Sequence, residues 1–253
     1  MISIKSEREI ELMRYAGKVT IDTINEIGKN IKIGVTTGAL DKIAYDYIIK
    51  HDCTPSCLGY EGYPASVCIS INDEVVHGIP GNRKIKDGDI VSVDLVVCYK
   101  GYHADATRTF IVGDVSEDIK ALVINTKEAF YEGLKKVKEG TRVYEISQAI
   151  EDYAHEHGLS VVEELVGHGI GTDMHEDPNI PNYNDGNNTK LKAGMTIAIE
   201  PMLNLGSKEI YIADDDWTVK TRDHMASAHY ENTVLVTKDG YEIITGEWLN
   251  GKE

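Results

Sequence analysis

The sequence is poor in cysteine, in basic residues and in long hydrophobic runs. Four cysteines in 253 residues are too few for a disulfide framework, and no second Cys/His pair follows Cys53 and Cys57 at zinc-site spacing. We therefore expect free thiols and a cytoplasmic location. Lysine and arginine total 26 against 42 aspartate and glutamate, a net charge of −16. Because binding to the phosphate backbone of nucleic acids needs a surface rich in lysine and arginine, we expect no nucleic-acid binding by the chain itself.

Signals for membranes and for several enzyme classes are also missing. Residues 1–17 lack the apolar core of a secretion signal, and the apolar run 91–99 is interrupted by Asp94 and too short to cross a bilayer. We expect no membrane association. The patterns G-x-S-x-G and H-E-x-x-H and the phosphate-binding P-loop are absent. With 42% hydrophobic and 27% charged residues, the composition is that of a globular protein.

The apolar periodicity predicts pairs of helices that alternate with groups of strands. Ser6 and Glu9 form a capping-box pattern, which starts a helix that reaches Ile27. The remaining predictions are helices at 37–50, 117–137 and 143–157, strands at 67–71, 90–97, 107–112, 161–166, 196–202 and 232–236, and a loop at 179–188.

This order of elements repeats, and some residues repeat with it. An offset of 106 aligns the following pairs: Gly34 with Gly140, Tyr47 with Tyr153, His51 with His157, Gly88 with Gly194 and Asp94 with Glu200. A second offset of 126 aligns Asp105 with Glu231. Any one match can be a coincidence, but together they predict one domain over 1–253, built from related halves at about 1–113 and 114–253.

Four acidic residues occupy positions where a carboxylate has little access to water. Asp94 and Glu200 lie inside apolar strand patterns, while Asp105 and Glu231 each begin a strand-like run. A single buried acid is commonly a structural residue with an arginine partner, but only Arg108 is near these strands. If the halves face each other, the four carboxylates converge. A multivalent cation would then relieve their repulsion.

Two histidines, His168 and His175, lie on a glycine-rich segment that can approach this cluster. Four carboxylates and an imidazole suit two divalent ions roughly 3.5–4 Å apart, an arrangement used in hydrolysis. Such ligands favour Co²⁺, Mn²⁺ or Fe²⁺, with Zn²⁺ and Ni²⁺ as alternatives. An imidazole ligand argues against a structural calcium site. The sequence leaves His103, His224 and His229 without a role.

Six ordered motifs resemble those of the type I methionine aminopeptidases, and the resemblance spans almost the whole chain. The motifs are Cys57-Leu-Gly-Tyr60-Glu-Gly-Tyr63-Pro-Ala-Ser-Val-Cys68, Val76-His77-Gly-Ile-Pro80, Asp94 with Asp105, Gly167-His168-Gly-Ile-Gly171, Ile199-Glu200-Pro-Met202 and Tyr230-Glu231-Asn-Thr233. The resemblance implies an α+β pita-bread (creatinase/aminopeptidase) fold. In that fold two pseudo-symmetric halves share a curved antiparallel sheet, with the helices outside.

The implied activity is that of a metal-dependent aminopeptidase, a hydrolase that removes N-terminal methionine from peptides and nascent proteins. By resemblance, the ligands of two divalent ions would be Asp94, Asp105, His168, Glu200 and Glu231. A water that bridges the ions would attack the first peptide bond, with Glu200 as proton acceptor. His77 would contact the amide nitrogen, and His175 would stabilise the carbonyl oxygen as charge develops.

The resemblance also implies a pocket for the methionine side chain beside His77 and His175. Its members would be Cys57, Tyr60, Tyr63, Cys68 and Trp217. Sulfur and aromatic edges suit an unbranched thioether, although such a cluster is in general more often plain core. Met174 stands where many relatives carry an aromatic residue, which bears on the pocket's shape and on the second residues that it tolerates.

The assignment to type I rests on length, because only 31 residues separate His168 from Glu200 and leave no room for a type II insertion. Because the first helix is predicted to begin near Ser6, we expect no N-terminal extension. The expected partners are N-termini of peptides and of nascent chains at the ribosome, and we expect a monomer. Two alternatives are an Xaa-Pro aminopeptidase or prolidase, which usually carries a large extra domain, and a non-catalytic pita-bread domain that binds proteins or RNA.

Overall fold

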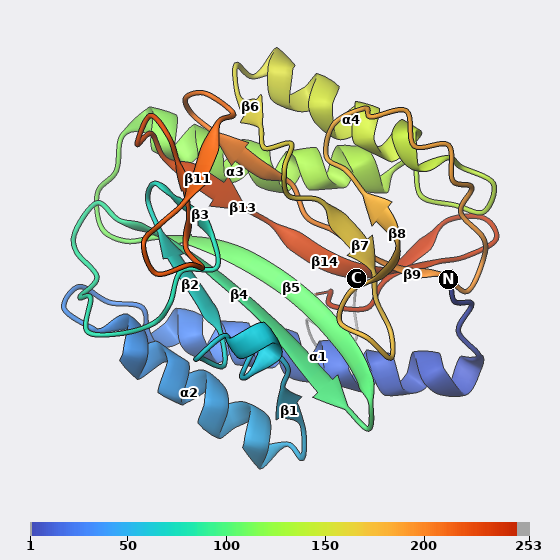
Figure 1. Ribbon diagram of the computed structural model, residues 1–253, viewed down its shortest axis with the longest axis horizontal. Coiled ribbons are helices and arrows are strands. Elements are labelled where there is room, and N and C mark those ends of the chain that lie inside the picture. The colour runs from blue at the N-terminus through green and yellow to red at the C-terminus, as the bar shows by residue number, and fades with distance from the viewer. Residues whose placement is uncertain (1, 247–253) are drawn as a thin grey trace.

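A nine-stranded antiparallel sheet runs through the centre of the molecule and takes strands from both ends of the chain (Figure 1). The computed structural model describes residues 2–246. The strand order is β1-β4-β5-β14-β9-β7-β8, with β2 beside β4 and β15 beside β14. The bounds are β1 (Thr54–Pro55), β2 (Cys68–Ile71), β4 (Ile90–Tyr99), β5 (Tyr102–Ile111), β7 (Gly167–Gly169), β8 (Glu176–Ile180), β9 (Thr196–Ile199), β14 (Glu231–Val236) and β15 (Tyr241–Ile243).

Two small sheets and a short 3₁₀ helix lie beside this large sheet. One sheet joins β13 (Ser227–His229), β10 (Met202–Asn204) and β6 (Ser160–Val161), and the other joins β11 (Ile210–Ile212), β12 (Val219–Thr221) and β3 (Glu74–Val76). The 3₁₀ helix η1 covers Tyr60–Gly62.

Two pairs of helices pack on the sheet, one pair from each half of the chain (Figure 1). They are α1 (Glu7–Asn30) with α2 (Thr37–Lys50), and α3 (Glu117–Leu134) with α4 (Val143–Glu156). The first pair buries its apolar face against β2, β4 and β5, and the second pair packs around Phe130 against β9, β10 and β14. This confirms the expected α+β class, with a curved antiparallel sheet and the helices outside. None of the helices within 2–246 is both long and apolar enough to cross a membrane.

The helix starts follow local capping chemistry that the sequence displays. The backbone N–H of Ser6 donates to the Glu9 carboxylate at 2.7 Å, as the capping-box pattern predicts. The hydroxyl of Thr36 accepts from the backbone N–H of Ala39 at the start of α2. The helix predicted to reach 137 ends at Leu134 instead, because Val137 fills the core from a turn and so extends the apolar pattern past the helix.

Three strand predictions and the loop prediction at 179–188 need correction, and two of the differences have a clear local cause. The strand predicted at 107–112 begins at Tyr102, so Asp105 lies within it; the residues that precede it, Lys100 and Gly101, form a tight left-handed turn at φ 49° and 84°. Pro201 separates β9 from β10 within the predicted 196–202 strand, because proline cannot donate to a ladder. Finally, 161–166 forms a strand only at its start, and β8 extends to Ile180 inside the predicted loop.

The offset of 106 seen in the sequence recurs in the contacts of both backbone and side chains. The matched contacts are the bridges Thr36–Lys84 and Arg142–Lys190, and the stacked pairs Tyr47–His51 and Tyr153–His157, whose ring centroids lie 4.3 and 4.1 Å apart. Gly34 and Gly140 both have φ of 90°. The division of one domain into halves at 1–113 and 114–253 stays a prediction, which this agreement supports.

A buried ion pair attaches the N-terminal segment to the second half. Lys5 Nζ donates to Glu176 Oε2 at 2.5 Å, and the two side chains are 3% and 9% exposed. The backbone N–H of Lys5 also donates to Gly194 O. Because Glu176 directly follows His175, this pair holds the segment that carries a candidate catalytic residue.

Replacing Lys5 by methionine should lower the free energy of unfolding by about 3 kcal/mol, because Glu176 is left buried without its partner. Urea unfolding measures this, with Lys18→Met as control: its exposed pair with Asp22 is worth about 0.5 kcal/mol or less. The double variant Lys5→Met/Glu176→Gln should recover much of the loss. Equal losses for Lys5→Met and Lys18→Met would contradict this account.

Candidate active site

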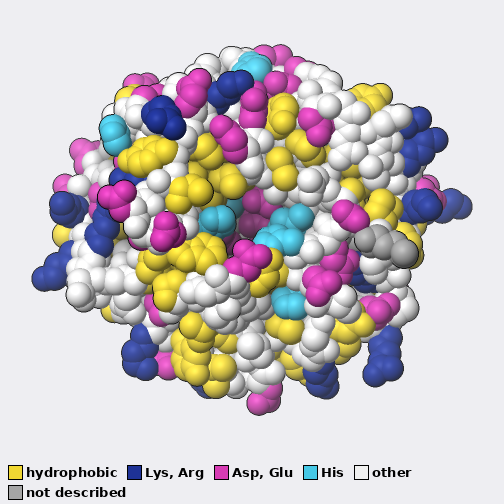
Figure 2. Space-filling model, viewed as in Figure 1, with side chains coloured by type: hydrophobic (Ala, Val, Ile, Leu, Met, Phe, Trp, Pro, Cys, Tyr) yellow, Lys and Arg dark blue, Asp and Glu magenta, His cyan; other side chains and the backbone are white. Residues whose placement is uncertain are grey.

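All thirteen residues predicted for the site line one pocket of about 440 Å³. Figure 2 shows a hollow near the centre of the molecule where histidine and acidic side chains meet beside hydrophobic ones. The residues are Cys57, Tyr60, Tyr63, Cys68, His77, Asp94, Asp105, His168, Met174, His175, Glu200, Trp217 and Glu231. Their placement in one pocket is what the sequence predicted, while their individual roles stay predictions.

Neighbouring strands carry the four carboxylates to the inner wall of this pocket. Asp94 lies on β4 and Asp105 on β5, Glu231 is the first residue of β14, and Glu200 follows β9 directly. In the β5–β14 pairing, Glu231 lies opposite Thr107, two residues from Asp105. Since residues i and i+2 of a strand share a face, the register brings these acids together.

Burial without a basic partner raises the pKa of every carboxylate in the cluster. Burial and then the charge of Glu231 raise the pKa values of Asp105 and Glu200 well above normal, and burial raises that of Asp94 to about 6. Arg108 donates to the backbone oxygens of Thr107 and Glu231 rather than to a carboxylate. Within 2–246 no lysine or arginine forms an ion pair with any of the four acids, so the structural-arginine alternative does not explain them.

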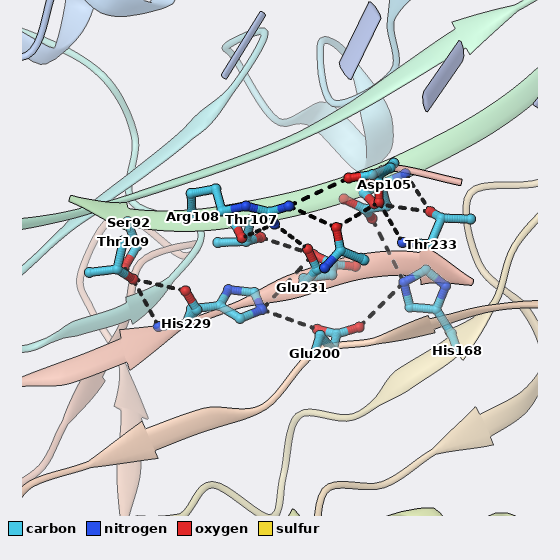
Figure 3. Close-up of polar contacts among 12 residues, drawn as sticks. Ser92, Asp105, Thr107, Arg108, Thr109, His168, Glu200, His229, Glu231 and Thr233 are labelled. Carbon is cyan, nitrogen blue, oxygen red and sulfur yellow. Dashed lines mark hydrogen bonds and ion pairs between the residues drawn. The ribbon is translucent and has the colours of Figure 1, made fainter. Parts of the chain in front are cut away.

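Several oxygen and nitrogen atoms of the cluster have lone pairs that no hydrogen bond uses and that could bind a divalent cation. Asp105 Oδ1 and Glu231 Oε1 are buried and have no hydrogen-bond partner. His168 Nε2 lies 3.5 Å from Glu200 Oε1 and 3.9 Å from Asp105 Oδ2 (Figure 3). These distances are too long for good hydrogen bonds but allow an ion between the atoms. Imidazole and carboxylate donors that converge in this way fit a transition-metal ion.

The backbone fixes the orientation of the His168 ring. Its Nδ1–H donates to Gly169 O at 2.8 Å, so Nε2 presents its lone pair to the carboxylates. Burial lowers the pKa of His168 to about 4, which keeps the ring neutral. Only glycine fits after it, because a Cβ at Gly169 would lie 2.2 Å from Asp177 O.

His175 and His77 approach the pocket from different segments. The His175 ring lies edge-on to that of His168 with centroids 4.4 Å apart, and its Nδ1 is hydrogen-bonded to Tyr60 Oη at 2.9 Å. His77 has a left-handed backbone with φ of 60°, a strained conformation that neighbouring contacts must hold. Tyr63 Oη provides one such contact by donating to Gly78 O at 2.9 Å.

Beside the histidines, the pocket wall becomes apolar and rich in sulfur. Cys57 and Cys68 are buried free thiols, and Met174 is 8% exposed. The Tyr63 and Trp217 rings pack edge to face with centroids 5.1 Å apart. A side chain that enters here meets thiols, a thioether and aromatic edges, surfaces that suit an unbranched apolar group.

His229 has no role predicted from the sequence, yet it lines the same pocket. Its Nε2 lies 3.8 Å from Glu200 Oε2 and 3.9 Å from Glu231 Oε2. The available signal was its position two residues before Glu231 in an extended segment, where alternate residues share a face. Glu61 and Asn179 also line the pocket and were not predicted.

Comparison with known proteins decides the family. The profile of metallopeptidase family M24 matches residues 11–238. The chain belongs to metallopeptidase family M24. Membership of this family implies the use of a divalent metal, and the carboxylate and histidine cluster is where this chain has the groups to bind one.

The relatives place this M24 member beside the methionine aminopeptidases. It is 50% identical to the methionine aminopeptidase of Clostridium perfringens over 246 residues, which cover 97% of this chain and 99% of that protein. The structure of methionine aminopeptidase from Thermotoga maritima has a TM-score of 0.96 at 41% identity and covers 98% of this chain and 100% of that one. The prolidase from Pyrococcus furiosus shares the fold, with a TM-score of 0.77 at 23% identity. The match covers 96% of this chain and 65% of that one. These likenesses confirm the pita-bread fold.

His77 should remain neutral far below the usual titration range of histidine. Burial is the larger cause and the nearby His175 the smaller one, and together they lower the pKa of His77 to about 4. Because this value lies below the unfolded value of about 6.5, His77 contributes a loss of stability as the pH falls from about 6.5 towards 4. In a histidine NMR titration, with His77→Asn to assign the signal, its ring resonances should stay at the neutral position down to about pH 5.5. A midpoint at or above about pH 6 would refute this.

Proposed function

We propose that this protein is a metal-dependent aminopeptidase that removes N-terminal methionine from peptides and nascent chains. The observation that carries the proposal is that one pocket joins four carboxylates, two buried and two partly buried, to a wall of thiols, thioether and aromatic rings. A metal ion held at the acidic end would bind the free α-amino group of a chain, and the apolar end receives its first side chain. An internal segment of a polypeptide has no free α-amino group.

We assign Asp94, Asp105, His168, Glu200 and Glu231 to the binding of two divalent ions. Oxygen-rich ligation favours Co²⁺, Mn²⁺ or Fe²⁺, with Zn²⁺ and Ni²⁺ as alternatives. Such ions, when bound, lower the pKa of water and polarise a carbonyl group. The orphaned oxygens of Asp105 and Glu231 support this assignment.

Three side chains are assigned to the reaction itself. Glu200 lies in the pocket beside His168, and we assign one of its carboxylate oxygens to accept the proton of the attacking water. His175 donates a hydrogen bond to the carbonyl oxygen as it gains charge, and Tyr60 orients that ring through Nδ1. His77, neutral at physiological pH, contacts the amide nitrogen of the scissile bond.

The substrate pocket is assigned to Cys57, Tyr60, Tyr63, Cys68, Met174 and Trp217, together with His77 and His175. Met174 adds a flexible thioether to the wall where an aromatic ring would be rigid, so the pocket can adjust to small second residues. We further propose that the protein acts as a monomer in the cytoplasm on chains that emerge from the ribosome. The four free cysteines are compatible with that reducing compartment.

A substrate panel separates this function from the prolidase-like alternative. Peptides that begin Met-Ala-Ser should lose methionine, because the thioether fits the sulfur and aromatic wall, while Gly-Pro and Ala-Pro-X peptides should stay intact. Mass spectrometry of the products, with each candidate metal added in turn, measures this. Cleavage of the proline peptides alone would favour the prolidase reading. A metal-loaded protein that cleaves neither class would favour a binding domain.

Replacing His175 by alanine should lower kcat roughly 10²–10³-fold, because a hydrogen bond that strengthens in the transition state is lost. The KM for a Met-Ala-Ser peptide should change much less, since the methionine wall is intact. His155→Ala, an exposed histidine of α4, is the matched control and should leave both constants unchanged. A normal kcat in His175→Ala would remove this residue from the proposed mechanism.

A further inference from the structure

His229 is a buried histidine whose ring nitrogens have no hydrogen-bond partner in the part of the chain that the structure describes. The residue is 2% exposed, and neither Nδ1 nor Nε2 forms a hydrogen bond within the described residues. Both backbone polar groups of His229, in contrast, are hydrogen-bonded. The N–H donates to Thr109 Oγ1 at 3.1 Å, and Thr109 Oγ1 donates to the His229 carbonyl at 2.8 Å. The main chain of His229 is therefore fixed, while its ring nitrogens have no hydrogen bond.

A buried imidazole without hydrogen bonds destabilises the folded protein if its role is only structural. Leaving a buried donor or acceptor without a partner costs about 1–3 kcal/mol, so native proteins pair nearly all of them. A hydrophobic side chain of similar size would fill the same space without that cost. The ring nitrogens of His229 therefore point to a ligand that is neither backbone nor side chain.

The Nε2 atom of His229 faces two of the carboxylates assigned to metal binding. Figure 3 shows the Glu200 carboxylate between the rings of His229 and His168, with one oxygen towards each. His229 Nε2 lies 3.8 Å from Glu200 Oε2 and 3.9 Å from Glu231 Oε2. His168 Nε2 lies 3.5 Å from Glu200 Oε1 and 3.9 Å from Asp105 Oδ2. Each ring nitrogen therefore lies at a similar distance from two carboxylates.

These separations suit ligands that share an ion. Two donor atoms each about 2.1 Å from a metal lie roughly 3.0–3.6 Å apart at angles of 90–120°, and small side-chain movements cover the remaining few tenths of an ångström. Direct hydrogen bonds would need about 3 Å. The ligand atoms of Glu200, His229 and Glu231 all lie within 4.8 Å of one another, as do those of Asp105, His168 and Glu231.

We propose that His229 is an additional metal ligand, so that the centre has two imidazoles rather than one. Nε2 of His229 joins Glu200 and Glu231, and Nε2 of His168 joins Asp105 and Glu231, with Glu231 common to both groups. The inference rests on the divalent metal use of the proposed function. A second nitrogen donor biases the centre towards Fe²⁺, Co²⁺, Ni²⁺ or Zn²⁺ and away from Mg²⁺ and Ca²⁺.

Proton NMR of the Co²⁺-loaded protein, with ring-¹⁵N histidine, counts the imidazoles bound to the paramagnetic ion. The wild type should show hyperfine-shifted ring signals from two histidines, and His229→Gln should show one. Calorimetric titration with Co²⁺ should give binding at least about tenfold weaker in His229→Gln, because even outer partners of metal ligands are worth 10–100-fold. The exposed His155→Gln is the matched control and should keep both signals and the wild-type affinity.

One shifted histidine in the wild type would overturn the proposal, and so would two in a folded His229→Gln. Should that variant fail to fold, the count in the wild type alone decides. The peptide assay separates this result from the proposed function: cleavage of Met-Ala-Ser by a protein with one bound imidazole refutes only the role of His229. Two bound imidazoles in a protein that cleaves no methionine peptide refute only the peptidase function.

Discussion

The convergence of four carboxylates in a buried pocket is the constraint on which the rest of the structure depends. Removing one such charge from water costs several kcal/mol, and placing four together adds repulsion. Within residues 2–246, Asp94, Asp105, Glu200 and Glu231 form no ion pair with a lysine or arginine, and their pKa values are raised accordingly. Without a compensating cation, the folded protein must hold protons on these groups or lose stability.

The fold meets this constraint by placing the acids on rigid, adjacent strands. Strands β4, β5, β14 and β9 are neighbours, and helix pairs from both halves cover the sheet. Local hydroxyls fix the positions further: Thr107 Oγ1 donates to Glu231 Oε2 at 2.9 Å, and the backbone N–H of Asp105 donates to Thr233 Oγ1 at 2.8 Å. The matched contacts at an offset of 106 show how a duplicated unit would supply acids from both sides.

Features that depend on local chemistry or on the repeat could be predicted from the sequence; those that depend on tertiary contacts could not. The capping box at Ser6 and the pairing of Asp94 with Glu200 are local or periodic signals, so the first helix and the acid cluster followed from them. The extra length of β5 depends on the turn before Tyr102. The strained backbone of His77 depends on contacts with distant segments. For His229 the sequence offers only its position two residues before Glu231, and the lack of a hydrogen-bond partner for its ring depends on the tertiary structure.

The central claim is that a divalent cation stabilises the carboxylate cluster, and urea unfolding of the metal-free protein during addition of Mn²⁺ or Co²⁺ tests it most directly. The account predicts a free energy of unfolding that rises with metal concentration, by about 2.7 kcal/mol when the free ion reaches 100 times its Kd. An unfolding midpoint that is the same with and without either ion would contradict it, because the buried acids would then need no cation.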